Sequence, residues 1–138
     1  MSKIEGGCMC GKVKYTSGAE PAMVAVCHCI DCQKQSGSAL SINIALAEDQ
    51  IAFTGELKLV LTSGSETGGK VNRYFCPNCG SPLYSAPEVM PGMIFLKAGT
   101  LDDTSWVKPD MNIWCASAQP WVSIDESLPI FPGNPPFE

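Results

Sequence analysis

Short runs in which hydrophobic and polar residues alternate recur along the chain, and most end at glycine, proline or a polar turn. Alternation with a period of two places every second side chain on one face of a sheet, so these runs predict half-buried β-strands. The sequence predicts little helix, with one short turn at residues 30–35 as the best candidate. We expect strands at residues 11–16, 23–28, 39–46, 51–54, 57–61, 71–75, 93–98 and 111–115.

The segments between these strands indicate how the chain is organised. Residues 63–69 read Ser-Gly-Ser-Glu-Thr-Gly-Gly and predict a polar loop, and residues 122–138 predict an irregular, proline-rich tail. There is no repeat, linker or low-complexity tract, so we expect residues 1–138 to form a single domain. Short strands with Gly and Pro turns favour a mainly β fold, with short antiparallel strands in two small sheets and few helices.

Composition and charge narrow the range of partners. Hydrophobic residues make up 45% of the chain and charged residues 17%, as in globular proteins. The net charge is −5, and an acidic domain gains nothing from counterion release, so we expect no nucleic-acid partner. No apolar run approaches the roughly 18 residues that span a bilayer, so we expect no membrane partner. The segment MSKIEGGCMC has no apolar signal-peptide core, which predicts a cytoplasmic location.

Cysteine is the residue type that carries candidate chemistry. In a reducing compartment disulfides do not persist, so the 8 cysteines indicate metal binding or thiol chemistry. All but Cys115 fall into three tight motifs, which are Cys8-Met9-Cys10-Gly11, Cys27-His28-Cys29-Ile30-Asp31-Cys32 and Cys76-Pro77-Asn78-Cys79-Gly80. The last motif has the spacing of a zinc knuckle, in which two thiolates point toward one metal.

The clustered cysteines divide into a set of three and a set of four. Cys27, Cys29 and Cys32 are close enough in sequence to bind one metal without help, which leaves an open fourth position. The remaining set would form a closed structural site that joins the N-terminal region to the middle of the chain, at Cys8, Cys10, Cys76 and Cys79. We therefore predict two zinc ions per chain, although spacing alone leaves other pairings open.

Two residues near these motifs have more than one interpretation. His28 is the only histidine, and strand alternation would turn its ring away from Cys27 and Cys29. We favour a structural role for it, with zinc ligation and proton transfer as alternatives. For Cys115 we favour a buried free thiol, and the alternative is that it approaches the open zinc.

Several segments between Gly6 and Trp121 match the motifs of a known family: GGCMCGKVKY, CHCIDCQKQSGSA, TGELK, RYFCPNCGSPLY, KAGTLDD and IWCASAQPW. On these motifs the chain resembles the glutathione-dependent formaldehyde-activating enzymes, also called S-(hydroxymethyl)glutathione synthase-like proteins, a family that includes centromere protein V. The resemblance implies a β-tent type fold and the same division of zinc ligands. Members often carry a histidine before the Ile-aromatic pair near the C-terminus, where this chain has Asn112.

The resemblance further implies a carbon–sulfur lyase-like activity, in which glutathione thiolate meets the second zinc and adds to formaldehyde or a related aldehyde. Glutathione is anionic, so we expect a cationic anchor near the motifs, and Lys34 is our first choice ahead of Arg73, Lys70 and Lys97. Ser36-Gly37-Ser38 could offer backbone amides to a carboxylate, which makes Ser36 and Ser38 candidate substrate contacts.

Three other functions compete with this hypothesis. The first is a non-enzymatic, zinc-stapled binding module for a thiol or a protein partner. The second is a chromatin module, which the acidic charge and the lack of a basic tail disfavour. The third is a dithiol oxidoreductase built on Cys29-Ile30-Asp31-Cys32, which the extra Cys27 and the missing βαβ pattern disfavour.

Overall fold

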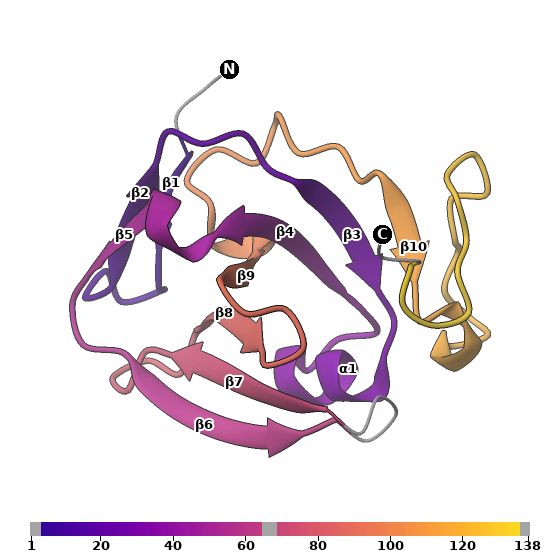
Figure 1. The fold of residues 1–138 in the computed structure, drawn as a ribbon, viewed down its shortest axis with the longest axis horizontal. Helices are drawn as coiled ribbons and strands as arrows, with labels where there is room; N and C mark the ends of the chain where they lie inside the picture. Colours follow the sequence, from indigo (N-terminus) through magenta and orange to yellow (C-terminus); the bar gives the residue numbers. More distant parts are fainter. Residues whose placement is uncertain (1–3, 65–68, 136–138) are drawn as a thin grey trace.

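The computed structural model describes residues 4–64 and 69–135, and within them β-strands dominate (Figure 1). The helical parts are one α-helix, α1 (Ile30–Ser36), and three 3₁₀ turns, η1 (Glu48–Gln50), η2 (Ala98–Thr100) and η3 (Cys115–Ser117). The strands are β1 (Ile4–Gly7), β2 (Lys14–Ser17), β3 (Met23–Cys27), β4 (Ser41–Ala47), β5 (Ile51–Thr54), β6 (Lys58–Ser63), β7 (Lys70–Phe75), β8 (Pro82–Pro87), β9 (Met93–Lys97) and β10 (Met111–Ile113). None of the described helices is long and apolar enough to cross a bilayer.

The strands form two sheets. The smaller has the order β1-β2-β5, and the larger has the order β10-β3-β4-β9-β8-β7-β6. This arrangement confirms the prediction of a mainly β fold with two sheets and few helices. It departs from the prediction in one pair, because β10 runs parallel to β3. Residues 98–110 return the chain across the sheet after β9, so β10 runs in the same direction as β3 instead of forming a hairpin.

Two strands were absent from our expectations, and both have weak sequence signals. β1 ends in Gly6 and Gly7, and Gly6 packs so closely against Thr100 and the Tyr15 ring that a Cβ atom would not fit. β8 begins and ends with proline, which usually argues against a strand that has neighbours on both sides. Its prolines are tolerated because they lie at the two ends of the strand.

The loop and the tail lie partly outside the described residues. Of the expected polar loop at 63–69, residues 65–68 are not described. Of the expected irregular tail at 122–138, residues 136–138 are not described, and the rest forms turns with one isolated bridge between Ile130 and Asn112. This C-terminal segment, yellow in Figure 1, lies beyond β10 at the edge of the larger sheet.

Two hydrophobic clusters fill the interior, and each contains part of the cysteine set. The main cluster lies around Ile4, Ile44, Leu46, Leu83 and Leu96, which are all at most 1% exposed, and it includes Cys8 and Cys76. The second cluster is smaller and consists of Ala25, Cys27, Cys32 and Ile113. The two predicted metal sites therefore lie against separate parts of the core.

Candidate functional site

The first group of cysteines comes from two turns that are far apart in sequence. Cys8 and Cys10 lie between β1 and β2, and Cys76 and Cys79 lie between β7 and β8. All four sulfur atoms lie within 4.8 Å of one another. The Sγ atoms of Cys8 and Cys10 are 3.5 Å apart, and those of Cys10 and Cys76 are 3.8 Å apart. Four thiolates around one zinc lie about 3.8 Å from each other, so this group, here named the closed cluster, fits zinc.

Hydrogen bonds hold the closed cluster in place. The backbone N–H of Val13 donates to Cys8 Sγ over 3.2 Å. Ser81 links the two turns, because its Oγ accepts from the backbone N–H of Met9 at 3.1 Å and lies 3.2 Å from Cys79 Sγ. The hydrogen bonds from Ser81 lower the pKa of the Cys79 thiol to about 5. The turn ends at Gly80, whose φ of 79° is a left-handed conformation that favours glycine.

The second group, here named the open cluster, consists of Cys27, Cys29 and Cys32. Cys27 ends β3, Cys29 is the N-cap of α1, and Cys32 lies in the first turn of that helix. Cys29 Sγ accepts from the backbone N–H of Cys32 at 3.2 Å, so the cap that starts the helix also orients the sulfur. The Sγ atoms of Cys27 and Cys32 are 3.4 Å apart. No fourth Cys, His, Asp or Glu among the described residues joins this group.

Two buried cations face the open cluster. Lys97 on β9 is 7% exposed, and its Nζ donates to Ser41 Oγ at 3.0 Å and to Asn43 Oδ1 at 3.2 Å. Arg73 on β7 is 6% exposed and donates from Nε to Thr62 Oγ1 at 2.9 Å. Contacts with the neighbouring thiols, aided by the charges of Lys97 and Arg73, lower the pKa of Cys32 to about 2. Contacts with Cys29 and Cys32 raise the pKa of Cys27, and burial lowers the pKa of Lys97. The two basic side chains therefore favour a thiolate at Cys32 in particular.

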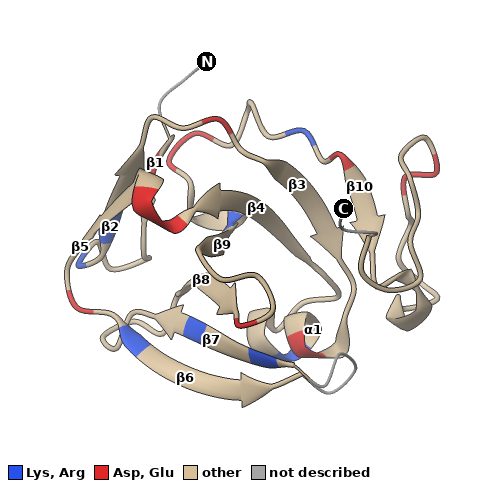
Figure 2. Ribbon diagram, viewed as in Figure 1, with Lys and Arg blue, Asp and Glu red and all other residues tan. Residues whose placement is uncertain are grey.

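The open cluster also lines a cavity of about 350 Å³. Its wall combines the three cysteines with two basic residues, Lys70 and Arg73, one acidic residue, Asp31, and apolar groups from Phe95, Ile113 and Trp114. Figure 2 shows these basic positions on β7, close to the end of α1. Trp114 has a φ of 57°, a left-handed conformation that is rare for a bulky residue and often occurs at functional sites. The open cluster therefore has space for a ligand beside it.

The three residues expected to contact substrate lie elsewhere. Lys34, Ser36 and Ser38 are exposed, on α1 and in the turn that follows it. None of them lines the cavity beside the open cluster. The cations on the cavity wall are Lys70 and Arg73. The sequence ranked Lys34 first because it is near Cys32 in the chain. Arg73 lies beside α1 only in the folded protein, where its Nη1 donates to Gln35 Oε1 at 2.8 Å.

His28, Asn112 and Cys115 also lie apart from the open cluster. As strand alternation predicted, His28 turns away from Cys27 and Cys29, and it lines a different cavity together with Asn112. Asn112 Nδ2 donates to the backbone oxygen of Asp125 at 3.1 Å, so it binds the C-terminal segment. Cys115 belongs to neither cluster, and burial raises the pKa of its thiol.

Comparisons with known proteins agree with the fold and the motifs. The crystal structure of a Rhodobacter sphaeroides protein has a similar fold, with a TM-score of 0.56 and 21% identity, over 76% of this chain and 91% of that chain. A Penicillium rubens protein is 26% identical over 110 residues, which are 78% of this chain and 56% of that protein. A Talaromyces marneffei protein is 23% identical over 118 residues, which are 83% of this chain and 62% of that protein.

Both fungal proteins are provisionally named glutathione-dependent formaldehyde-activating enzymes. The chain spans less than two thirds of the length of either relative. The model of the family described as "Glutathione-dependent formaldehyde-activating enzyme" matches residues 3–117, which include both cysteine clusters. The chain therefore belongs to the glutathione-dependent formaldehyde-activating enzyme family.

Proposed function

We propose that this chain is a zinc-dependent enzyme of the carbon–sulfur lyase type, which adds glutathione to formaldehyde or to a related aldehyde. One observation carries the proposal. Among the described residues, three cysteine sulfurs without a fourth protein ligand open onto a cavity whose wall carries two basic residues, one acidic residue and apolar groups. A three-ligand zinc site with space beside it is the usual form of a catalytic zinc site, whereas a four-ligand site is structural.

Two zinc ions per chain fit this division. The closed cluster would hold one, and its binding free energy would contribute to folding. The open cluster would hold the other, and a zinc ion bound there supplies a positive charge that lowers the pKa of a coordinated thiol. The cytosol keeps thiols reduced, so a cytoplasmic location is part of the proposal.

The cations around the open cluster would offset its negative charge. Three thiolates and one divalent metal carry a net charge of −1, and a substrate thiolate would add another. Lys97 and Arg73 are both buried and both act on Cys32, so they lie where this charge would accumulate. Moving a charge from water into the protein interior is costly unless an opposite charge lies nearby. Here the basic side chains and the thiolates would compensate each other.

The cavity wall would orient glutathione. Lys70 and Arg73 would face its carboxylates, while Phe95, Ile113 and Trp114 would exclude water from the reacting atoms. In the reaction the S–H bond of glutathione breaks and a C–S bond forms to the aldehyde carbon. The carbonyl π electrons move to the oxygen, which takes up a proton. The product is a hemithioacetal, S-hydroxymethylglutathione for formaldehyde, and no oxidant or other co-reactant is needed.

Exchange NMR would test the activity against the spontaneous reaction. With formaldehyde and glutathione at equilibrium, the rate of exchange between glutathione and S-hydroxymethylglutathione is measured with and without protein. We expect zinc-loaded wild type to accelerate the exchange. With Cys29→Ser, the exchange rate should equal the rate measured in buffer without protein. An exchange rate that wild type does not alter would contradict the proposed enzyme.

One observation favours a second candidate function, a zinc-stapled module that binds a thiol without catalysis. The chain has a single histidine, and it lies on the other side of the β3–β10 pair from the open cluster. Histidine is the commonest group for moving a proton near neutral pH. In the described part of the chain, no histidine lines the cavity beside the open cluster, here named the sulfur-lined cavity. Saturable binding of glutathione without faster exchange would support this module.

A further inference from the structure

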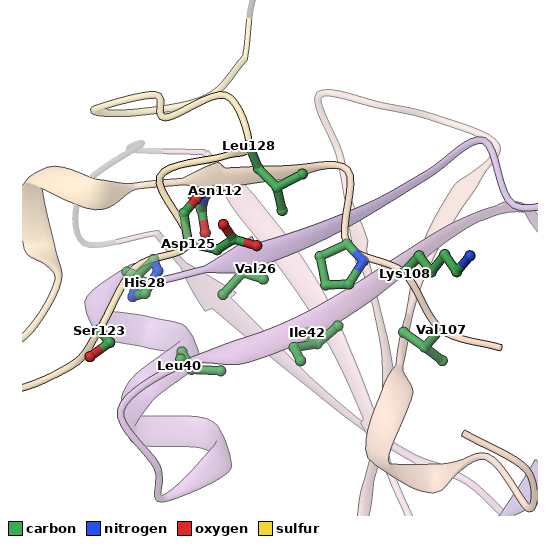
Figure 3. A pocket seen from close by; sticks show the side chains of 11 residues that line it. Val26, His28, Leu40, Ile42, Val107, Lys108, Asn112, Ser123, Asp125 and Leu128 are labelled. Atoms are coloured by element: carbon green, nitrogen blue, oxygen red, sulfur yellow. Dashed lines mark hydrogen bonds between the residues drawn. The ribbon is translucent and has the colours of Figure 1, made fainter. Parts of the chain in front are cut away.

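A second cavity, of about 450 Å³, lies next to β3, β4 and β10 and is separate from the sulfur-lined cavity (Figure 3). Alternation along the strands separates the two. Cys27 and Ile113 face the sulfur-lined cavity, whereas Val26, His28 and Asn112 face the second one. Residues of the C-terminal segment, Ser123, Asp125 and Leu128, complete its wall. The second cavity therefore occupies a place that the proposed reaction does not use.

His28 is the feature that points to a ligand in this cavity. Its side chain is 1% exposed, and neither Nδ1 nor Nε2 has a hydrogen-bond partner among the residues that the structure describes. A buried polar group without a partner costs roughly 1–3 kcal/mol, so such groups are rare unless a ligand or water satisfies them. The ring lines a cavity large enough for a small molecule.

The rest of the lining defines the kind of ligand. Figure 3 shows His28, Asn112 and Asp125 at one end of the cavity, with Val26, Leu40 and Ile42 beside them and Lys108 directed away at the other end. A carboxylate at the polar end would be repelled by Asp125. The hydroxyl group of an alcohol both donates and accepts, so it can pair with His28 in either neutral tautomer. The aliphatic side chains would cover an apolar ligand body.

We propose that this cavity is a second ligand site, which binds a small uncharged molecule with an apolar body and a hydroxyl head group. The hydroxyl group hydrogen-bonds with His28, and the body packs on Leu40, Ile42 and Leu128. The site does not depend on the proposed lyase activity, because none of its lining residues belongs to either cysteine cluster.

NMR spectra of the single imidazole test this site directly, because His28 is the only histidine and its ring signals need no assignment. Zinc-loaded protein is titrated with 1-hexanol, and separately with hexanoate and hexylamine. We expect a saturable shift of the His28 ring signals with 1-hexanol at millimolar concentration, and an affinity at least about tenfold weaker for hexanoate, which Asp125 would repel. Saturating glutathione should leave the hexanol affinity unchanged.

Two variants are designed to block the cavity, and a third serves as the matched control. Leu128→Trp replaces a half-buried lining residue and should abolish the shift, whereas Leu61→Trp replaces a leucine that is 52% exposed on β6 and should not. Ser123→Phe blocks the polar end from an exposed position if Leu128→Trp fails to fold. The proposal would be overturned if wild type showed no shift or if the shift survived both blocking variants. It would also be overturned if glutathione competed with hexanol or if a charged probe bound more tightly than hexanol.

Discussion

The two cysteine clusters use the same ligand atoms but differ in what surrounds them. The closed cluster draws four sulfurs from two turns that are 66 residues apart at Cys10 and Cys76, and it packs on the main core. The open cluster draws its three sulfurs from a six-residue segment, at the end of β3 and the start of α1, and it lines a cavity. The number of sulfurs and the space beside them, more than the ligand type, are the basis of our proposal that the closed cluster is structural and the open cluster reactive.

The largest effect is expected from breaking the closed cluster. Cys76→Ser removes a ligand that is 1% exposed, and the remaining sulfurs would bind zinc too weakly to hold the two turns together. Because zinc binding in a structural site is also folding free energy, we expect a loss on the order of several kcal/mol and mostly insoluble protein. Thermal unfolding of any soluble fraction measures the loss. Cys115→Ser is the matched control, since Cys115 belongs to neither cluster and its removal should leave the melting temperature nearly unchanged.

A change in the open cluster should remove function and leave the fold. Cys29→Ser keeps a side-chain oxygen that can still accept from the N–H of Cys32, so α1 should retain its N-cap. We expect two zinc ions in wild type and one in the variant, by elemental analysis of protein purified without chelator. Titration calorimetry should show that the variant neither binds glutathione nor releases the proton that a ligating thiol must lose. If both cysteine variants lowered the melting temperature equally, the division into closed and open clusters would be wrong.

The sequence predicted both clusters because their ligands lie in short motifs, where spacing alone restricts geometry. The same reasoning selected Lys34 over Arg73, because Lys34 is two residues from Cys32 and Arg73 is far from it in sequence. Arg73 reaches the site only through the tertiary arrangement that places β7 beside α1, which local patterns do not encode. The parallel pairing of β10 with β3 escaped prediction for the same reason, since it follows from a crossover and not from any hydrophobic pattern.

The buried lysine tests how charge is balanced at the open cluster. Lys97→Met keeps the length of the side chain and removes its charge, so the ligand thiolate would lose a nearby cation. We expect glutathione affinity to fall roughly tenfold, or about 1.4 kcal/mol, with both zinc ions retained. Calorimetry in buffers of different ionisation enthalpy gives the affinity and the number of protons released. Lys58→Met, at an exposed position on the edge strand β6, is the control and should change neither value. Unchanged affinity in Lys97→Met would show that the buried ammonium acts on the fold and not on the ligand.

The smallest effect is expected from the cations that would bind the carboxylates of glutathione, and it discriminates between two predictions. Lys70 lines the sulfur-lined cavity, whereas Lys34 is exposed on α1 and lies outside the wall. Both side chains are exposed, so either contact would be screened by solvent and would change affinity by only about two- to fivefold. We expect Lys70→Ala to weaken glutathione by this factor and to leave 2-mercaptoethanol, a thiol without carboxylates, unaffected. Lys34→Ala is the matched comparison, and a selective loss there instead would restore the anchor expected from the sequence. Equal losses for both thiols in Lys70→Ala would mean that Lys70 acts through the general field of the cavity and not through a carboxylate.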